Sequence, residues 1–286
     1  MKLMRFGDRD GAKTPCLLDG EGRARDASAI VGDFGPHRLT PEVIATLKAT
    51  DPESLPVADV AGKRIAPPVA QPKNIYCIGL NYSDHAAEAG LPVPQEPILF
   101  NKSSGTYCGP NDDILYSPKM SKLDWEVELG IVIGKEALNI PKDAALDHIL
   151  GFTVVNDVSE RAWQQERGGQ WAKGKSFPNF CPTGPVLVSG DELGDGGALD
   201  MWLEVNGKRM QTGNTDRMIF DCATIVSYLS EFIRLEPGDL ICTGTPPGVG
   251  MGQSPQVWLK PGDVLRLGVE GLGEQSQQVV ALGDES

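Results

Sequence analysis

Residues 125–133 have the sequence Trp125-Glu126-Val127-Glu128-Leu129-Gly130-Ile131-Val132-Ile133. The odd-numbered positions are all large and apolar, which predicts a β-strand with its even-numbered positions on the opposite face. Glu126 and Glu128 therefore project together, about 7 Å apart along the backbone. Because like charges on one face repel, a cation between them would compensate for both. For this pair by itself, the alternative is a solvated face with two exposed glutamates.

A third carboxylate, Asp157, follows the strand-like run Gly151-Phe152-Thr153-Val154-Val155-Asn156. So apolar a run gives little reason for an acidic residue at its end unless the side chain points into a site. Three carboxylates without His or Cys form a hard oxygen ligand set, which favours Mg²⁺ or Mn²⁺. The same set admits Ca²⁺ and disfavours Zn²⁺.

Strand signals dominate the chain from Asn74 onward. Besides 125–133, strands are predicted at 75–78, 97–100, 152–156, 201–205, 208–211, 239–243 and 263–269. Asn206-Gly207 predicts a tight hairpin, because both positions of such a turn need φ > 0. Helices are predicted at 41–48, 84–89, 159–167 and 222–233. The pattern indicates an α+β fold that is predominantly β.

The first 65 or so residues mix short strand-like pieces with Gly and Asp turns. They lead into a proline-rich stretch that is typical of a linker, Ala66-Pro67-Pro68-Val69-Ala70-Gln71-Pro72. With 286 residues, the chain is long enough for a large and a small domain. We expect a small N-terminal α+β domain over residues 1–68 and a larger domain over 69–286.

Composition excludes several classes of protein. The formal net charge of −13 disfavours nucleic acid, since phosphate binding needs clustered basic side chains. The longest apolar runs are far shorter than the roughly 20 residues of a membrane span, and the N-terminus lacks a signal-peptide core. Six cysteines are scattered singly, without a CxxC pair, which indicates reduced thiols in a cytoplasmic protein.

His85 and Glu88 stand three residues apart in a short predicted helix, so they share a face. A histidine oriented by a carboxylate is a common way to build a base that works near neutral pH. The alternative for this pair alone is a surface ion pair.

Lys175 follows a glycine-rich stretch, residues 167–171, and could bind an anion or an oxyanion. Composition does not distinguish Lys175 from Lys173 in this role. Residues 242–250 form a Gly/Pro-rich loop at a strand end, which can offer backbone N–H groups and hydroxyls to a carboxylate. The loop lacks the GxxxxGK[ST] pattern and the chain has no GxGxxG, so nucleotide binding is not favoured.

Taken together, these residues resemble the fumarylacetoacetate hydrolase superfamily over roughly residues 72–280. Five motifs in the family's order carry the resemblance: Ile78-Gly79-Leu80-Asn81-Tyr82-Ser83-Asp84-His85, Asp124-Trp125-Glu126-Val127-Glu128-Leu129, Val155-Asn156-Asp157-Val158-Ser159-Glu160-Arg161, Gly174-Lys175-Ser176-Phe177 and Thr243-Gly244-Thr245-Pro246-Pro247-Gly248-Val249-Gly250. The resemblance implies a mixed β-roll with a small N-terminal domain, assembled as a homodimer.

The resemblance also implies roles for individual residues. The ligands of Mg²⁺ or Mn²⁺ would be Glu126, Glu128 and Asp157. The residues that activate water would be His85 and Glu88. The site lysine would be Lys175 in preference to Lys173. The residues that contact the substrate would be Arg161, Gln164 and Thr245.

The implied reaction is hydrolysis of a C–C bond in a 2,4-dioxo acid with release of pyruvate. Such substrates include 2,4-diketo-3-deoxy-L-rhamnonate, the corresponding fuconate, and acylpyruvates. Ureidoglycolate lyase, oxaloacetate decarboxylase and diene-diacid isomerase activities remain alternatives on the same scaffold. A protein that binds a metal and an acid without turnover is a further alternative, although binding alone would not need His85 and Glu88.

Overall fold

The structure, a computed structural model, describes residues 1–84 and 93–283, and strands dominate this part of the chain. The larger sheet has ten strands in these ranges. Across the sheet they are β3 (Ala24–Asp26), β2 (Thr14–Leu18), β1 (Lys2–Phe6), β14 (Leu187–Val188), β11 (Ile149–Asn156), β10 (Val127–Ile133), β17 (Leu240–Cys242), β5 (Ile75–Gly79) and β6 (Ile98–Lys102), with β4 (Ile65–Ala66) paired to β1.

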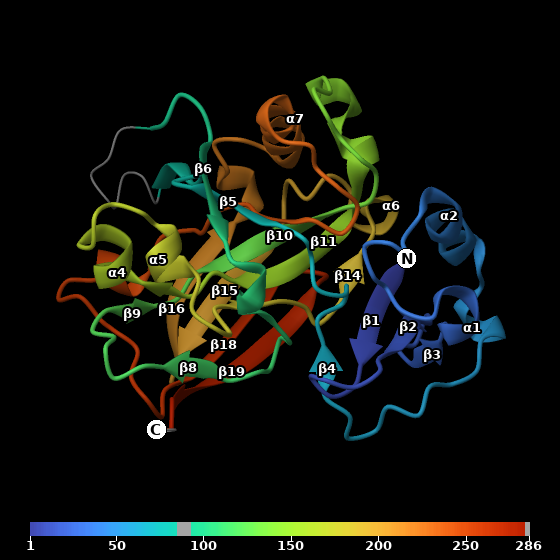
Figure 1. The fold of residues 1–286 in the computed structure, drawn as a ribbon, viewed down its shortest axis with the longest axis horizontal. Helices are drawn as coiled ribbons and strands as arrows, with labels where there is room; N and C mark the ends of the chain where they lie inside the picture. Colours follow the sequence, from blue (N-terminus) through green and yellow to red (C-terminus); the bar gives the residue numbers. More distant parts are fainter. Residues whose placement is uncertain (85–92, 284–286) are drawn as a thin grey trace.

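A second sheet has five strands in the same part of the chain. Their order is β16 (Lys208–Asn214), β15 (Asp200–Val205), β18 (Val264–Val269), β19 (Gly273–Ala281) and β8 (Ile114–Tyr116). In Figure 1, β10 and β11 cross in front of β15 and β18, and these strands contact one another. The remaining described strands form two separate two-stranded sheets: β12 (Ser159–Glu160) with β9 (Leu123–Asp124), and β13 (Cys181–Pro182) with β7 (Tyr107–Cys108). The predicted β-dominated α+β fold is confirmed.

The two faces of β10 pack into different parts of the core. Val127, Leu129 and Ile131 belong to the cluster that contains the apolar residues of β15 and β18. Val132, on the other face, packs with residues of the N-terminal strands. The alternation predicted for residues 125–133 is therefore confirmed, although the regular strand starts at Val127.

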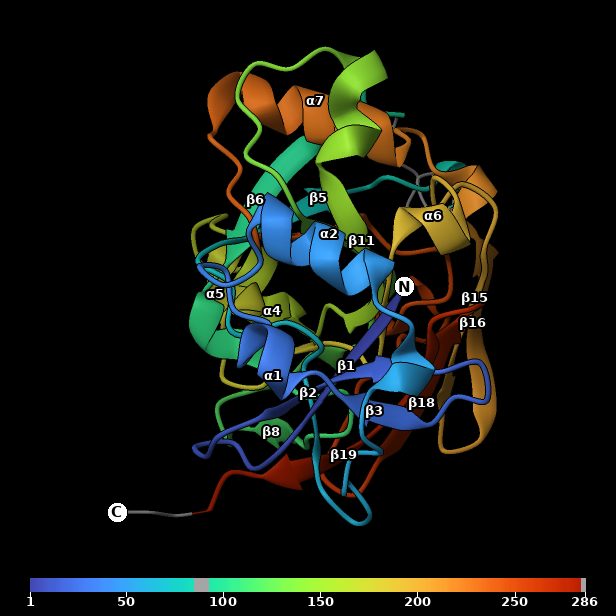
Figure 2. The same ribbon diagram turned by 90° about the vertical axis from the view of Figure 1, so that its right-hand side faces the viewer.

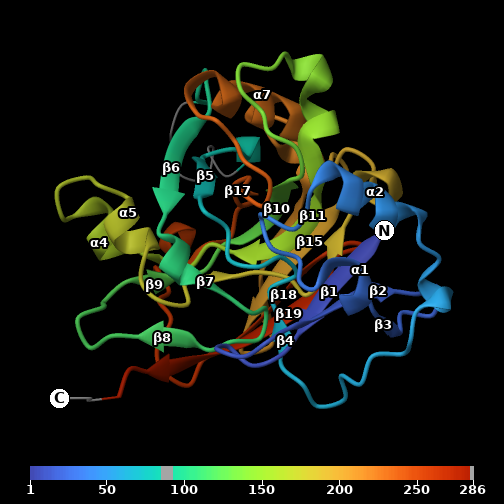
Figure 3. The same ribbon diagram turned by 45° about the vertical axis from the view of Figure 1, so that its right-hand side comes forward.

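The helices are short. They are α1 (Ser28–Val31), α2 (Pro41–Ala49), α4 (Arg161–Gln165), α5 (Ala172–Lys175), α6 (Gly190–Leu193) and α7 (Cys222–Phe232), with 3₁₀ turns η1 (Pro52–Ser54), η2 (Ser104–Thr106), η3 (Lys142–His148), η4 (Thr215–Arg217) and η5 (Gly250–Gly252). In Figure 2, α1 lies beside the N-terminal strands and α2 lies above them, and Figure 3 shows α4 and α5 on the opposite side of the molecule. None of the described helices is long and apolar enough to cross a membrane.

Local signals explain the elements that were predicted well. Asp221 caps α7 by accepting a 2.7 Å hydrogen bond from the Thr224 amide, and the helix buries its apolar face. In the hairpin between β15 and β16, Asn206 and Gly207 have φ of 52° and 77°, as the turn requires.

The helix predicted over 159–167 is shorter than expected. Ser159 and Glu160 instead pair with Asp124 and Leu123, and the Glu160 carboxylate caps α4 by accepting from the Ala162 amide. Pairing to a distant strand therefore overrides the local helical pattern at these two residues.

The N-terminal strands continue the main sheet. Leu3 of β1 pairs with Leu187 of β14, and through this contact β1, β2 and β3 extend the sheet that contains β10. The domain boundary at residue 68 stays a prediction.

Candidate metal centre

Three buried carboxylates meet where β10 and β11 pair. Glu126 comes directly before β10, Glu128 lies within it, and Asp157 follows β11 directly. The Asp157 amide donates a 2.9 Å hydrogen bond to the Glu126 carbonyl, so antiparallel pairing brings the two residues together. One oxygen from each of the three side chains lies within 4.8 Å of the others. The alternative of a solvated glutamate face is wrong, because Glu126 and Glu128 are only 6% and 2% exposed.

Basic side chains neutralise two of these carboxylates. Lys175 Nζ lies 2.8 Å from Glu126 Oε2 and 2.7 Å from Asp157 Oδ2. Arg161 Nη2 donates a 2.6 Å hydrogen bond to Glu126 Oε1. Lys102 Nζ donates to Asp157 Oδ1 and, at 3.1 Å, to the Val158 carbonyl. Although burial opposes ionisation of Glu126, the charges of Lys175 and Arg161 outweigh it and lower its pKa.

Glu128 lacks such a partner among the described side chains. Its Oε2 accepts a 2.8 Å hydrogen bond from the Gly244 amide, and no basic group forms an ion pair with it in the described chain. Burial, together with the charges of Asp157 and Glu126, raises its pKa well above the usual range. A divalent cation held by the three carboxylates would compensate this buried charge, so the residues present fit a metal ion.

The charge of the whole cluster suits an anionic ligand. The buried acidic side chains are Asp124, Glu126, Glu128 and Asp157, and the buried basic ones are Lys102, Arg161 and Lys175. When ionised, they leave one negative charge, which a divalent ion would change to one positive charge. A carboxylate would be attracted to such a centre.

The structure distinguishes Lys175 from Lys173. Lys173 is exposed and donates to the Arg167 carbonyl, whereas Lys175 is 2% exposed and points into the cluster. A Cβ at Gly174 would lie 2.4 Å from the Glu160 carbonyl oxygen, so only glycine lets α5 pack this closely. This close packing holds Lys175 against the carboxylates.

Asp124 and Lys102 were missed by sequence reasoning. Asp124 accepts hydrogen bonds from the amides of Gly250 (2.6 Å) and Met251 (3.0 Å) and from Arg161 Nε (2.9 Å). It thereby joins the loop after β17 to the arginine that contacts Glu126. The position of Asp124 two residues before Glu126 was a usable signal, whereas nothing near Lys102 marked it.

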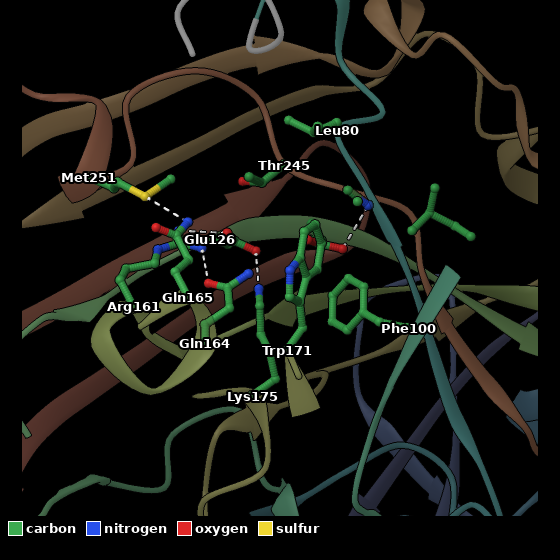
Figure 4. A pocket seen from close by; sticks show the side chains of 14 residues that line it. Leu80, Phe100, Glu126, Arg161, Gln164, Gln165, Trp171, Lys175, Thr245 and Met251 are labelled. Carbon is green, nitrogen blue, oxygen red and sulfur yellow. Dashed lines mark hydrogen bonds and ion pairs between the residues drawn. The ribbon is translucent and has the colours of Figure 1, made fainter. Parts of the chain in front are cut away.

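A pocket opens beside Glu126 and Glu128, and the predicted substrate contacts Arg161, Gln164 and Thr245 line it. Gln164 Oε1 accepts a 3.1 Å hydrogen bond from Arg161 Nη1. Thr245 Oγ1 donates to the Val127 carbonyl and accepts from Gln211 Nε2, both at 2.8 Å. Figure 4 shows Arg161, Gln164, Thr245 and Lys175 around Glu126. Their roles toward a substrate stay predictions.

His85 and Glu88, the predicted base and its partner, lie outside the described residues. Their roles therefore rest on the sequence alone.

Most of the chain matches a known protein family. Residues 74–280 match the family described as "Fumarylacetoacetate (FAA) hydrolase C-terminal". The chain belongs to this family. A relative from Burkholderia multivorans, provisionally named a hydrolase, is 53% identical over 279 residues, which cover 97% of this chain and 98% of the relative.

Solved structures of fumarylacetoacetate hydrolase family members share the whole fold. Fumarylacetoacetate hydrolase from Exiguobacterium antarcticum has a TM-score of 0.85 at 35% identity, and 2-hydroxyhepta-2,4-diene-1,7-dioate isomerase from Mycobacterium marinum has 0.76 at 31%. Maleylpyruvate hydrolase from Sphingobium sp. SYK-6, solved with manganese(II) and pyruvate, has 0.80 at 25%. Each comparison covers 99% of this chain and 100% of the other. The chain is thus an enzyme of a family that contains hydrolases and isomerases.

Proposed function

We propose that this protein is a divalent-metal-dependent hydrolase that cleaves a C–C bond in a 2,4-dioxo acid and releases pyruvate. The observation that carries the proposal is the buried cluster of Glu126, Glu128 and Asp157, in which Glu128 has no basic partner among the described residues. The solved relative that holds manganese(II) and pyruvate supports the same assignment.

Glu126, Glu128 and Asp157 would hold Mg²⁺ or Mn²⁺. When bound there, the ion would act as a Lewis acid toward the oxygens of a 2-oxo acid. Since all three ligands are carboxylates, either hard cation suits the site, and Ca²⁺ remains admissible.

Lys175 is suited to stabilise negative charge on the substrate. An ammonium has three N–H donors, and two of them serve Glu126 and Asp157. The third is left for an oxygen of the substrate, where it would stabilise the charge that develops when water attacks the C4 carbonyl. Because Lys175 is buried, this hydrogen bond would form away from bulk water and would be correspondingly strong.

Arg161 and Gln164 would bind the carboxylate end of the substrate. The Arg161 guanidinium donates from Nε to Asp124, from Nη2 to Glu126 and from Nη1 to Gln164. A guanidinium has five N–H donors, so some remain for a carboxylate. Thr245 lines the same pocket, but it donates its hydroxyl hydrogen to Val127.

His85 would take the proton from the attacking water, and Glu88 would orient His85. This pair separates hydrolysis from binding, because a protein that only bound metal and acid would not need a base.

Isomerisation of a diene diacid is the second candidate. It is favoured by the solved isomerase from Mycobacterium marinum, which is 31% identical and shares the fold over the whole chain. The same cluster could bind a 2-oxo acid while a proton moves between carbons, with no water consumed. Lyase and decarboxylase activities are distinguished from both by their products.

The test is product formation from a substrate panel by metal-free enzyme, with Mg²⁺, Mn²⁺ or EDTA added. The panel contains an acylpyruvate, a 2,4-dioxo-3-deoxy sugar acid, oxaloacetate, ureidoglycolate and a diene diacid. Metal-dependent pyruvate from a dioxo acid is expected. Glyoxylate alone would indicate the lyase, pyruvate and CO₂ from oxaloacetate alone the decarboxylase, and an isomer without cleavage the isomerase. Normal metal binding without any product would favour a binding protein.

A further inference from the structure

The pocket around the carboxylates has an apolar side. Among the described residues that line it, the large apolar ones are Ile78, Leu80, Phe100, Trp171 and Met251. In Figure 4 the rings of Phe100 and Trp171 lie on one side of Glu126 and Lys175, and Arg161 and Met251 lie on the other. A bound substrate therefore meets an aromatic wall on the side away from Arg161.

The wall begins close to the reacting groups. Phe100 and Trp171 form an edge-to-face pair with ring centroids 5.2 Å apart. Lys175 Nζ lies 5.1 Å from the centroid of the Phe100 ring. A carbonyl oxygen bound by Lys175 would thus bring the group attached to that carbonyl beside the two rings.

Trp171 packs directly against the backbone of Gly79, where there is no side chain to displace it. A Cβ at Gly79 would lie 2.7 Å from Cζ3 of Trp171, which is closer than two such atoms can approach, and 3.1 Å from Cη2. Since the φ of Gly79 is not positive, an alanine backbone would be tolerated at this position and only the space is restricted. The edge of the indole therefore rests against the bare backbone at the end of β5.

We propose that this site selects 2,4-dioxo acids whose substituent at C4 is apolar, alkyl or aryl, and that Trp171, seated on Gly79, is the residue that determines this specificity. The inference rests on the proposed function, since it names the substrate class of that same site. A hydroxylated sugar chain against these rings would lose water, and the indole N–H of Trp171 is the one hydrogen-bond donor that the two rings could offer it, so most of its hydroxyls would lose free energy there.

The first test compares kcat/KM for three dioxo acids: 2,4-dioxopentanoate, 4-phenyl-2,4-dioxobutanoate and a 2,4-dioxo-3-deoxy sugar acid. The phenyl substrate is expected to exceed the sugar acid by at least about tenfold, as apolar contacts in pockets are worth about 10–200-fold. Trp171→Ala should lower kcat/KM for the phenyl substrate by about 10–100-fold and for the methyl substrate by much less. Trp202→Ala is the matched control, because that ring contacts Arg209 and Arg266 in the second sheet and does not line the pocket.

The second test is a double-mutant cycle between Gly79 and Trp171, followed with the phenyl substrate. Gly79→Ala alone should lower kcat/KM by displacing the indole. In the Trp171→Ala background it should have almost no further effect, because the atom it would strike is gone. Thermal unfolding of each variant, and its activity on 2,4-dioxopentanoate, separate a shifted ring from a misfolded chain.

The outcomes distinguish the two proposals. If dioxo acids are cleaved but the sugar acid is the best substrate and its kcat/KM survives Trp171→Ala, the specificity assignment is overturned while the hydrolase stands. Additive effects in the cycle would also overturn the role of Gly79. If no dioxo acid is cleaved by metal-loaded enzyme, the proposed function itself fails.

Discussion

The ammonium of Lys175 lies 2.7 Å from Oδ2 of Asp157. Lys175 ends α5, whereas Asp157 follows β11, so the contact joins this short helix to the larger sheet. Because Asp157 is also a candidate metal ligand, the lysine and a metal ion would share one carboxylate. Replacing Lys175 or removing the metal should therefore change both the charge compensation of Asp157 and the activity.

Replacing Lys175 tests its role toward the substrate. Lys175→Met should lower kcat by about 10²–10³-fold, the usual effect of removing one donor to a developing oxyanion. It should also tighten Mg²⁺ binding, because a positive charge beside Glu126 and Asp157 is lost. Steady-state kinetics and calorimetric titration with Mg²⁺ measure the two effects. The exposed Lys173→Met is the control, and equal losses in both variants would contradict the assignment.

Removal of the metal should destabilise the protein as well as inactivate it. At a metal concentration of about 100 Kd, binding contributes about 2.7 kcal/mol, which corresponds to a rise in Tm of about 4–5 °C for a chain of this size. Glu128→Gln should largely abolish this rise, measured by calorimetry with Mg²⁺ or EDTA. The exposed Glu231→Gln should retain it. A Glu128→Gln protein with the full metal-induced rise would argue against Glu128 as a ligand.

Asp124 should act through Arg161 without touching the substrate itself. Asp124→Asn weakens the acceptor for Arg161 Nε and for the Gly250 and Met251 amides. We expect kcat/KM to fall by about 10–100-fold, as for other residues that orient a binding group. The substitution should mainly raise KM, because Arg161 would bind the substrate carboxylate. Asp113→Asn, at an exposed aspartate that does not line the pocket, should be neutral. An unchanged KM with a reduced kcat would contradict this role of Asp124.

The charge of Asp112 should stabilise the fold at neutral pH and should stop doing so in acid. Burial opposes its charge, but hydrogen bonds from Arg64 and the Gly109 amide outweigh this and lower its pKa below the usual 3.8. A lowered pKa in the folded state contributes stability that is present above about pH 4 and is lost as the pH falls below it. Asp112→Asn should therefore cost about 1–3 kcal/mol at pH 7.

Urea unfolding at pH 7 and at pH 3 measures this cost. The difference between Asp112→Asn and the parent protein should shrink at pH 3. A difference that stays the same at both pH values would show that Asp112 stabilises the fold by packing and not by charge.

A homodimer, expected from the resemblance to the family, can be tested by sedimentation equilibrium. At micromolar concentration the mass should be twice the 30.6 kDa of one chain. A mass of one chain throughout the concentration range would contradict the expectation.

Much of the site could be predicted because its signals are local. Alternation in residues 125–133 placed Glu126 and Glu128 on one face, and the structure buries both there. Asp157 was predicted from the apolar strand that precedes it. The period of a strand is a property of the backbone, so these conclusions needed no knowledge of what packs against β10.

Strand β19 was not predicted, because two of its three buried positions are polar. Gln275 is buried and donates to the carbonyls of Val154 (2.9 Å) and Gly184 (3.0 Å). Gln277 is buried too, and it accepts a 3.1 Å hydrogen bond from Asn156 Nδ2. Polar side chains that satisfy distant backbone groups erase the alternation of apolar and polar residues on which strand prediction depends.

The sequence by itself thus determined the strand, the three carboxylates on it and beside it, and the family to which they belong. The resemblance to the family already favoured Lys175 over Lys173, and the structure places Lys175 against Glu126 and Asp157. Only the tertiary structure decided that Lys102 and Asp124 join the cluster and that Trp171 rests on Gly79. The reason is physical: side-chain alternation is set within a few residues of backbone, whereas ion pairs and ring contacts join segments that are brought together only when the sheets pack.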